Sequence, residues 1–264
     1  TIYFDAKEGA STFIDLVAAK VHSAVLNGKD ISPDLYQDSR LPLEGLAKKN
    51  KLTVDADFFY MNTGEGLHRS VDPADGDVYL YSQFEVADAR RVYPTFEQPD
   101  LKASFTFTVK VPKEWTVFSV SPTPVPTIEG AYSTFNFAPT PRVSTYITAI
   151  VAGPYVGKTA VIRSIDGREI DLGVFCRASL AKYLDADQII QITEQGFGFF
   201  ENAYGIPYPF TKYDQIFVPE FNAGAMENAG CVTLRDQYIF RSKPTEWQLE
   251  NRTNTILHEL AHMW

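Results

Sequence analysis

Two histidines and a glutamate lie close together in the string His258-Glu259-Leu260-Ala261-His262. Residues four apart lie on one face of a helix, with Cβ atoms about 5–6 Å apart, so both imidazoles can reach one metal ion. Imidazole is a common zinc ligand, and a carboxylate beside a metal-activated water is the usual general base of a metallopeptidase. The spacing therefore predicts a catalytic zinc site with His258 and His262 as ligands and Glu259 as the base.

The residues upstream predict the helix that carries this site. Thr245 and Gln248 have the spacing of a capping box, which begins a helix just after Pro244. Apolar and small residues then recur at helical spacing, at Thr253, Ile256, Leu257, Leu260 and Trp264. A second stripe beside them consists of Asn254, His258 and His262. We expect the apolar stripe to face the core and the histidine stripe to lie along the flank of the helix.

The metal site lacks one ligand within this sequence. A catalytic zinc normally has three protein ligands and a water molecule, and only two residues follow His262. We expect the third ligand to lie beyond Trp264, because the chain ends directly after the helix. We also expect this helix end to fray, and residues 1–264 alone to hold zinc weakly or not at all unless a carboxylate from elsewhere completes the site.

A second string, Gly224-Ala225-Met226-Glu227-Asn228, begins 34 residues before His258. Together the two strings resemble the aminopeptidase N family of zinc metallopeptidases, which are gluzincins with a thermolysin-like catalytic domain. The resemblance implies that G-A-M-E-N forms an edge strand lining the substrate. It also implies a glutamate as third zinc ligand and a tyrosine that stabilises the transition state, both further along the chain.

A third segment agrees with this family. Gln83-Phe84-Glu85 resembles its Q-x-E strand, and the Asp88–Pro94 segment resembles its D-A-R-R motif. Glu97-Gln98 stands where Asp-Glu is common in the family, which is a departure in a stretch that we interpret as structural. The resemblance extends over roughly residues 79–264.

The resemblance also assigns residues to the substrate. An aminopeptidase recognises a free α-ammonium group, which is mostly charged at pH 7. Glu227 and Glu85 are the candidates for binding this cation near the zinc. Gln83, which we place on the same strand face as Glu85, can hydrogen-bond the backbone of the first substrate residue. Gly224 would allow a peptide backbone to approach closely, with Ala225, Met226 and Asn228 on the same substrate-lining strand.

Composition narrows the possible partners and location. The formal charge of −9 and the isoelectric point near 5.0 argue against binding to nucleic acid or to an anionic membrane. No apolar run approaches the ~20 residues of a membrane span. Cys176 and Cys231 are isolated in the sequence, so we expect buried free thiols and a cytoplasmic location, although one disulfide is possible.

Hydrophobic patterning predicts two regions. Residues 1–155 show strand-like alternation and turn signals, such as Asn27-Gly28 after the segment 20–26 and the alternating apolar positions of segment 105–111. We expect a saddle-like or sandwich-like antiparallel β domain there, with its first strands missing. Residues 156–264 read as the front of an α+β thermolysin-like catalytic domain that stops after the H-E-x-x-H helix.

Three functions compete at this point. The first is a zinc aminopeptidase acting on peptides with a free N-terminus, with broad preference for neutral or basic first residues. The second is the leukotriene-hydrolase branch, which adds epoxide hydrolysis; its string more often begins G-G, so Ala225 disfavours it. The third is a non-catalytic β-rich interaction module with an incomplete peptidase site. The intact set of His258, Glu259, His262 and Glu227 favours the first.

Overall fold

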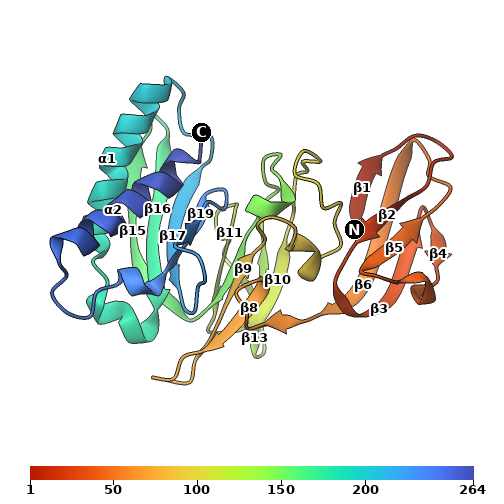
Figure 1. Ribbon diagram of the computed structural model, residues 1–264, viewed down its shortest axis with the longest axis horizontal. Coiled ribbons are helices and arrows are strands. Elements are labelled where there is room, and N and C mark those ends of the chain that lie inside the picture. The colour runs from red at the N-terminus through yellow and green to blue at the C-terminus, as the bar shows by residue number, and fades with distance from the viewer.

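The computed structural model describes residues 1–264 and arranges them in five β-sheets and two α-helices (Figure 1). The N-terminal lobe lies at the right of Figure 1, a second group of sheets in the middle, and the part that contains both helices at the left. No α-helix occurs before residue 186, which confirms the prediction of a β-rich first half.

The N-terminal lobe combines a four-stranded sheet of order β1-β6-β3-β4 with the two-stranded sheet β2-β5. Its strands are β1 (Ile2–Asp5), β2 (Thr12–Asp15), β3 (Ala18–Leu26), β4 (Lys29–Ile31), β5 (Arg40–Leu43) and β6 (Lys49–Phe58). Asn27 and Gly28, with φ of 53° and 82°, form the predicted tight turn between β3 and β4. The core of the lobe is aliphatic, built around Ile14, Leu41 and Leu52.

The middle part contains a five-stranded sheet, β11-β14-β9-β8-β7, and a three-stranded sheet, β10-β13-β12. The strands are β7 (Tyr60–Met61), β8 (Gly66–Val71), β9 (Val78–Gln83), β10 (Thr108–Pro112), β11 (Thr116–Ser119), β12 (Thr127–Glu129), β13 (Tyr132–Asn136) and β14 (Ile150–Gly153). Every pair is antiparallel except the short β7–β8 pair. The strand predicted from residue 105 begins only at Thr108, and Phe105 and Phe107, which precede it, pack against Tyr93.

The third part is a mixed sheet of order β15-β16-β17-β19-β18. Its strands are β15 (Tyr155–Arg163), β16 (Glu169–Arg177), β17 (Lys212–Val218), β18 (Ala225–Met226) and β19 (Cys231–Arg235). The three central strands are parallel, and β15 and β18 run antiparallel along the two edges. The sheets change between Gly153 and Tyr155, next to the predicted boundary at residues 155 and 156, which stays a prediction.

This mixed sheet is covered on both faces. The helices α1 (Ala186–Tyr204) and α2 (Glu246–Ala261) pack on the face that carries Tyr213 and Phe217. The opposite face, with Ile216 and Val218, packs against Tyr79, Tyr81 and other residues of the middle part. Burial on both faces explains why Ile216, Phe217 and Val218 are consecutive apolar residues at the end of β17. The two halves of the chain therefore share a hydrophobic core on this second face of the sheet.

The two helices approach closely at Gly196. A Cβ at this position would lie 2.6 Å from a methyl group of Leu257 and 2.8 Å from one of Leu260, so a larger residue would displace these leucines. Helix α1 ends at Gly205, whose φ of 66° is the expected left-handed cap. The close contact places the apolar stripe of α2 against α1, as the sequence pattern predicted.

Several predictions about residues outside the histidine motif can be compared with the structure. Glu97, which departs from the family string, accepts hydrogen bonds from the backbone N–H of Arg90 at 2.9 Å and the hydroxyl of Thr145 at 3.0 Å. Cys176 and Cys231 are buried free thiols, as predicted. Neither helix is long and apolar enough to cross a bilayer.

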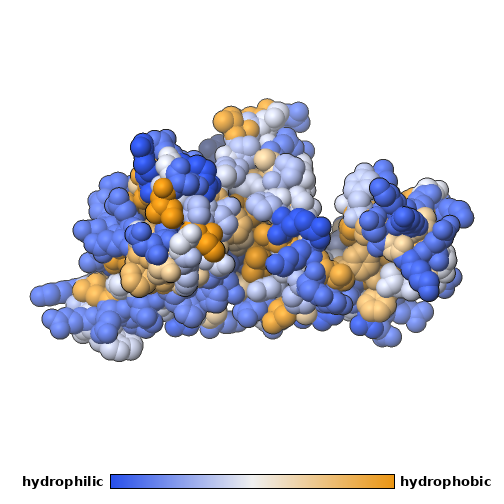
Figure 2. All heavy atoms as spheres, turned by 90° about the horizontal axis from the view of Figure 1, so that it is seen from above, coloured by the Kyte–Doolittle hydropathy of each residue, from blue (hydrophilic) through white to orange (hydrophobic).

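Figure 2 shows a notch between the N-terminal lobe, at the right, and the rest of the molecule.

Candidate metal centre and peptide-binding site

Helix α2 presents the two predicted metal ligands on its exposed flank. The capping box between Thr245 and Gln248 is formed, so the helix begins where the sequence predicted. Nε2 of His258 and Nε2 of His262 lie 3.2 Å apart, with the rings 4.8 Å apart at 78°. Two nitrogen ligands at 2.0–2.1 Å from a tetrahedral zinc are about 3.3 Å apart. The histidine pair therefore has the spacing that zinc requires.

Glu259 lies on the same helix but faces inward. Its side chain is 5% exposed, and Oε2 has no hydrogen-bond partner. Burial, followed by the negative charges of Glu227 and Glu85, raises the pKa of Glu259 from 4.5 to about 8. A buried carboxyl without donors is a group that can accept and release a proton near neutral pH.

The chain offers two candidate metal ligands, His258 and His262. Nowhere in residues 1–264 do three or more histidine, cysteine, aspartate or glutamate side chains gather as a metal site. The donor set at His258 and His262 fits zinc in type and spacing, and a catalytic zinc takes one more protein ligand.

The histidine end of α2 is held in place, so the expectation that it frays is wrong. Met263 is 5% exposed, and its sulfur accepts a hydrogen bond from the N–H of Gly230 at 3.4 Å. The indole of Trp264 packs against Phe197 and donates from Nε1 to the carbonyl of Ile206 at 2.8 Å. These contacts come from residues distant in sequence, which the local helix pattern did not reveal.

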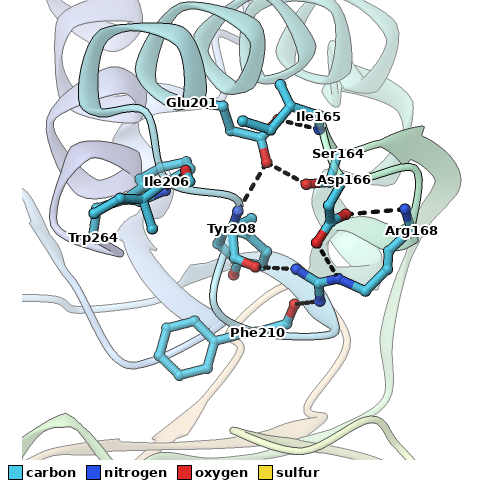
Figure 3. A network of polar contacts seen from close by, with 9 residues as sticks. All are labelled: Ser164, Ile165, Asp166, Arg168, Glu201, Ile206, Tyr208, Phe210 and Trp264. Atoms are coloured by element: carbon cyan, nitrogen blue, oxygen red, sulfur yellow. Dashed lines mark hydrogen bonds and ion pairs between the residues drawn. The ribbon is translucent and has the colours of Figure 1, made fainter.

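The loop that receives Trp264 is itself fixed by a polar network (Figure 3). Glu201, 1% exposed on α1, accepts hydrogen bonds from the backbone N–H groups of Tyr208 at 2.8 Å and Ile165 at 2.9 Å, and from the hydroxyl of Ser164. Arg168 donates to the carbonyl of Tyr208 at 2.5 Å. The network joins α1 to the β15–β16 turn and to the loop after α1, and Trp264 contacts this loop through the carbonyl of Ile206.

Two residues of the G-A-M-E-N string, Ala225 and Met226, form the predicted edge strand β18, whereas Asn228 lies outside it. Ala225 and Met226 pair with β19, and β18 has no neighbour on its other side. Glu227 follows this strand and is half-buried, and its negative charge contributes to the raised pKa of Glu259. Asn228 is buried and donates to the hydroxyl of Thr233 at 3.4 Å, which holds the strand end. A Cβ at Gly224 would approach only the hydroxyl of Tyr238, at 3.3 Å, so this side of the strand is open.

The N-terminal half contributes two of the predicted residues. Gln83, the last residue of β9, donates from Nε2 to the sulfur of Met226 at 3.5 Å, and its buried Oε1 has no partner. Glu85 is exposed and lies beyond the strand end, after the fully buried Phe84. The expectation that Gln83 and Glu85 share one strand face is therefore wrong, because β9 stops at Gln83. The negative charge of Glu85 nevertheless contributes to the raised pKa of Glu259.

Two tyrosines near these carboxylates were not found from the sequence. The pKa of Tyr146 is raised by burial and by the charges of Glu227 and Glu85. The hydroxyl of Tyr213 is buried without a partner, and burial and the charge of Glu259 hold its pKa well above the usual value. Tyr213 and Phe217 share the helix-covered face of β17 at period-two spacing, and this sequence pattern could have placed Tyr213 near α2. No sequence pattern indicates the position of Tyr146.

The remaining histidines bind carboxylates outside this site. His22 pairs with Asp57 at 2.9 Å in the N-terminal lobe, and His68 pairs with Glu220 at 2.9 Å. Neither lies in a group of three or more side chains that could hold a metal ion.

Comparison with known proteins agrees with these features. Residues 16–147 match the peptidase M1 N-terminal domain, and residues 189–264 match the peptidase family M1 domain. The chain is 57% identical over 267 aligned residues to aminopeptidase N of Streptomyces lividans, covering 100% of this chain and 31% of that protein. It is 32% identical to aminopeptidase N of Rattus norvegicus, covering 83% of this chain and 23% of the relative. The corresponding values for aminopeptidase N of Acetobacter pasteurianus are 34%, 70% and 51%. The chain thus spans about half or less of the length of these relatives.

Proposed function

The chain belongs to peptidase family M1, and we propose from this that it forms the substrate-binding half and part of the metal site of a zinc aminopeptidase. The reaction is the release of the N-terminal residue from a peptide. The substrates are peptides with a free α-amino group.

The observation that carries this proposal is the arrangement on α2. Two imidazole nitrogens lie 3.2 Å apart, and the buried carboxyl of Glu259 between them in sequence has an unpartnered oxygen. A structural helix would not be expected to bury a carboxyl without a donor, because such a group destabilises the fold. The arrangement is of use to a reaction that needs a metal and a base together.

His258 and His262 would hold the zinc ion through their Nε2 atoms. Zinc bound there would activate a water molecule and polarise the carbonyl of the first peptide bond. Glu259 accepts the proton from the attacking water and then delivers it to the amine that leaves. Its pKa of about 8 suits both transfers, and a nearby cation favours the ionised, proton-accepting form.

Glu227 and Glu85 bind the α-ammonium group of the substrate. Both lie close enough to Glu259 for their charges to raise its pKa, and they come from different halves of the chain. A cation bound between them offsets their mutual repulsion. Because the amine is fixed beside the metal ligands, only the first peptide bond reaches the reacting position, which makes the enzyme an exopeptidase.

The edge strand β18 supplies the peptide-backbone contacts. Its outer N–H and C=O groups have no strand neighbour, so an extended peptide can pair with it as an added strand. The free Oε1 of Gln83, beside Met226, can accept a hydrogen bond from the first substrate residue. These contacts orient the peptide but do not take part in proton transfer.

The direct test uses the full-length protein, its zinc-depleted form, and peptides of known sequence. We expect sequential release of N-terminal residues by the zinc-loaded protein, measured by mass spectrometry, and none after chelation. Cleavage within the peptide instead of at its N-terminus would contradict the proposal.

A further inference from the structure

The loop before the peptide-binding strand leaves the catalytic half and lies against the middle part of the N-terminal half. It comprises residues 219–224, between β17 and β18. Phe221 is 5% exposed and packs against Tyr81 of β9, with ring centroids 5.3 Å apart. The side-chain amide of Asn222 donates to the carbonyl of Thr63. The loop is therefore fixed by residues more than a hundred positions away in the sequence.

Glu220 is the point of strain in this loop. Its φ of 55° lies in the left-handed region, which is strained for a residue with a Cβ and persists only where the surroundings impose it. The hydroxyl of Tyr81 donates to the backbone carbonyl of Glu220 at 3.2 Å, and Nε2 of His68 lies 2.9 Å from its carboxylate. Both contacts come from the N-terminal half, so that half imposes the conformation.

The contacts of His68 fix its ring so that Nε2 donates a hydrogen bond to Glu220. It is 1% exposed and stacks on Tyr81, with centroids 4.8 Å apart at 21°. Its Nδ1 accepts a hydrogen bond from the N–H of Gly64 at 3.0 Å, so the ring proton of the neutral imidazole is on Nε2 and points at Glu220. Gly64 has a φ of 84°, and a Cβ there would lie 2.3 Å from the amide nitrogen of Asn222. The packing thus fixes both the ring and the loop that it contacts.

The other end of the loop is tied to β19. Arg235 donates from its backbone N–H to the carbonyl of Gly224 at 3.0 Å and from Nε to the carbonyl of Ala223 at 3.0 Å. Three residues lie between Glu220 and Gly224, and contacts hold the segment along its length. A displacement at Glu220 would therefore shift β18 and Glu227, which directly follows this strand.

We propose that His68 is a positioning residue: through Glu220 it sets the position of the peptide-binding strand relative to the metal ligands. The inference rests on the proposed peptidase function and adds a residue from the N-terminal half to its machinery. His68 does not touch the substrate. It acts by keeping the loop 219–224 in the one conformation that aligns Glu227, and misplacement of a binding group by about 1 Å can cost roughly a hundredfold in rate.

The test compares two substitutions of His68 in the full-length protein. Glutamine places an amide N–H near the position of Nε2 and can still donate to Glu220, whereas asparagine is one methylene shorter and cannot. We expect His68→Asn to lower kcat/KM for a free tripeptide roughly 10- to 100-fold and to reduce its preference over the acetylated tripeptide. His68→Gln should recover most of this loss. Zinc content should be unchanged in both.

The matched control is His22→Asn. His22 also binds a carboxylate, Asp57, in the N-terminal half but lies away from the loop, so this variant should keep the wild-type kcat/KM. If His68→Asn does not yield folded protein, Glu220→Ala and Glu220→Gln test the same contact from its other side. The glutamine variant keeps an acceptor for Nε2, so alanine should lose activity and glutamine should not.

Hydrogen–deuterium exchange of residues 219–228 separates this inference from the proposed function. Faster exchange there in His68→Asn, but not in His68→Gln or His22→Asn, is expected even if no peptidase activity is found. An inactive wild type with this exchange pattern overturns the peptidase function only. Equal losses in the two His68 variants, or wild-type exchange and activity in His68→Asn, would overturn the positioning role.

Discussion

The side-chain amide of Gln83 donates to the sulfur of Met226 at 3.5 Å, although the two residues are 143 positions apart. Gln83 ends β9 of the N-terminal half, and Met226 lies in the edge strand β18 of the mixed sheet. The N-terminal half therefore forms one wall of the proposed peptide-binding site. Substitutions in the N-terminal half should change substrate binding without changing zinc binding by His258 and His262.

Zinc retention should depend on residues outside this chain. Residues 1–264 provide His258 and His262 only, so we expect zinc to leave a purified protein of this length during dialysis. In the full-length protein we expect one zinc per chain, and its loss in His262→Ala. Metal analysis of the three samples checks this. Equimolar zinc that stays with residues 1–264 would contradict it.

Glu259→Gln should abolish proton transfer without disturbing the metal site. The amide has the shape of the carboxyl but cannot accept the proton, so we expect kcat of the full-length enzyme to fall by roughly 10²- to 10⁴-fold. Zinc content should stay at the wild-type value. Glu250→Gln, an exposed glutamate on the same helix, is the control and should keep full activity. If the Glu259 variant retains more than about a tenth of the rate, Glu259 is not the base.

The raised pKa of Glu259 makes the metal-free protein less stable at alkaline pH. Below pH 4.5 the carboxyl is protonated in both the folded and the unfolded chain. As pH rises from 4.5 towards about 8, the unfolded chain loses the proton first, so folding stability falls over this range. Glu259→Gln should remove this decline and raise the free energy of unfolding at pH 8.5 by a few kcal/mol. Denaturant titrations at pH 5 and 8.5 measure it, and an identical pH dependence in both proteins would contradict it.

Glu201→Gln should loosen the loop that receives Trp264. Glu201 accepts hydrogen bonds from two backbone N–H groups and the hydroxyl of Ser164, and an amide group would turn an N–H towards donors. We expect a loss of about 2–4 kcal/mol in the free energy of unfolding, because the replaced group is buried and charged. Glu194→Gln, an exposed position on the same helix, should be neutral. Equal stability of the two variants would show that the network does not hold the loop.

Local patterns predicted the elements that depend on neighbouring residues. The capping box at Thr245 and the turn at Asn27 formed as the sequence indicated. Hydrogen bonds within a few residues determine each of these, so the sequence window contains the whole interaction. The histidine pair followed for the same reason, since helix geometry alone brings residues four apart together.

Long-range contacts were not predictable in this way. Trp264 is held by Ile206, and Glu220 is held by His68 at a separation of 152 positions. Such partners depend on how the sheets pack, which no pattern within one segment encodes. Glu85 was assigned correctly to the neighbourhood of Glu227 only through the family resemblance, and its expected strand geometry was wrong.

The measurement that tests the peptidase proposal most directly is discrimination between free and acetylated N-termini. Glu227 lies next to the edge strand, and its charge acts on Glu259, so it is placed to bind the α-ammonium group. Acetylation removes the cation and leaves the carboxylate without a partner, which should cost a few kcal/mol. In the full-length enzyme, the ratio of kcat/KM for matched free and acetylated peptides should be large for the wild type and should fall sharply in Glu227→Gln, with zinc content unchanged. A Glu227→Gln enzyme that discriminates as strongly as the wild type would contradict the proposed recognition of the free N-terminus.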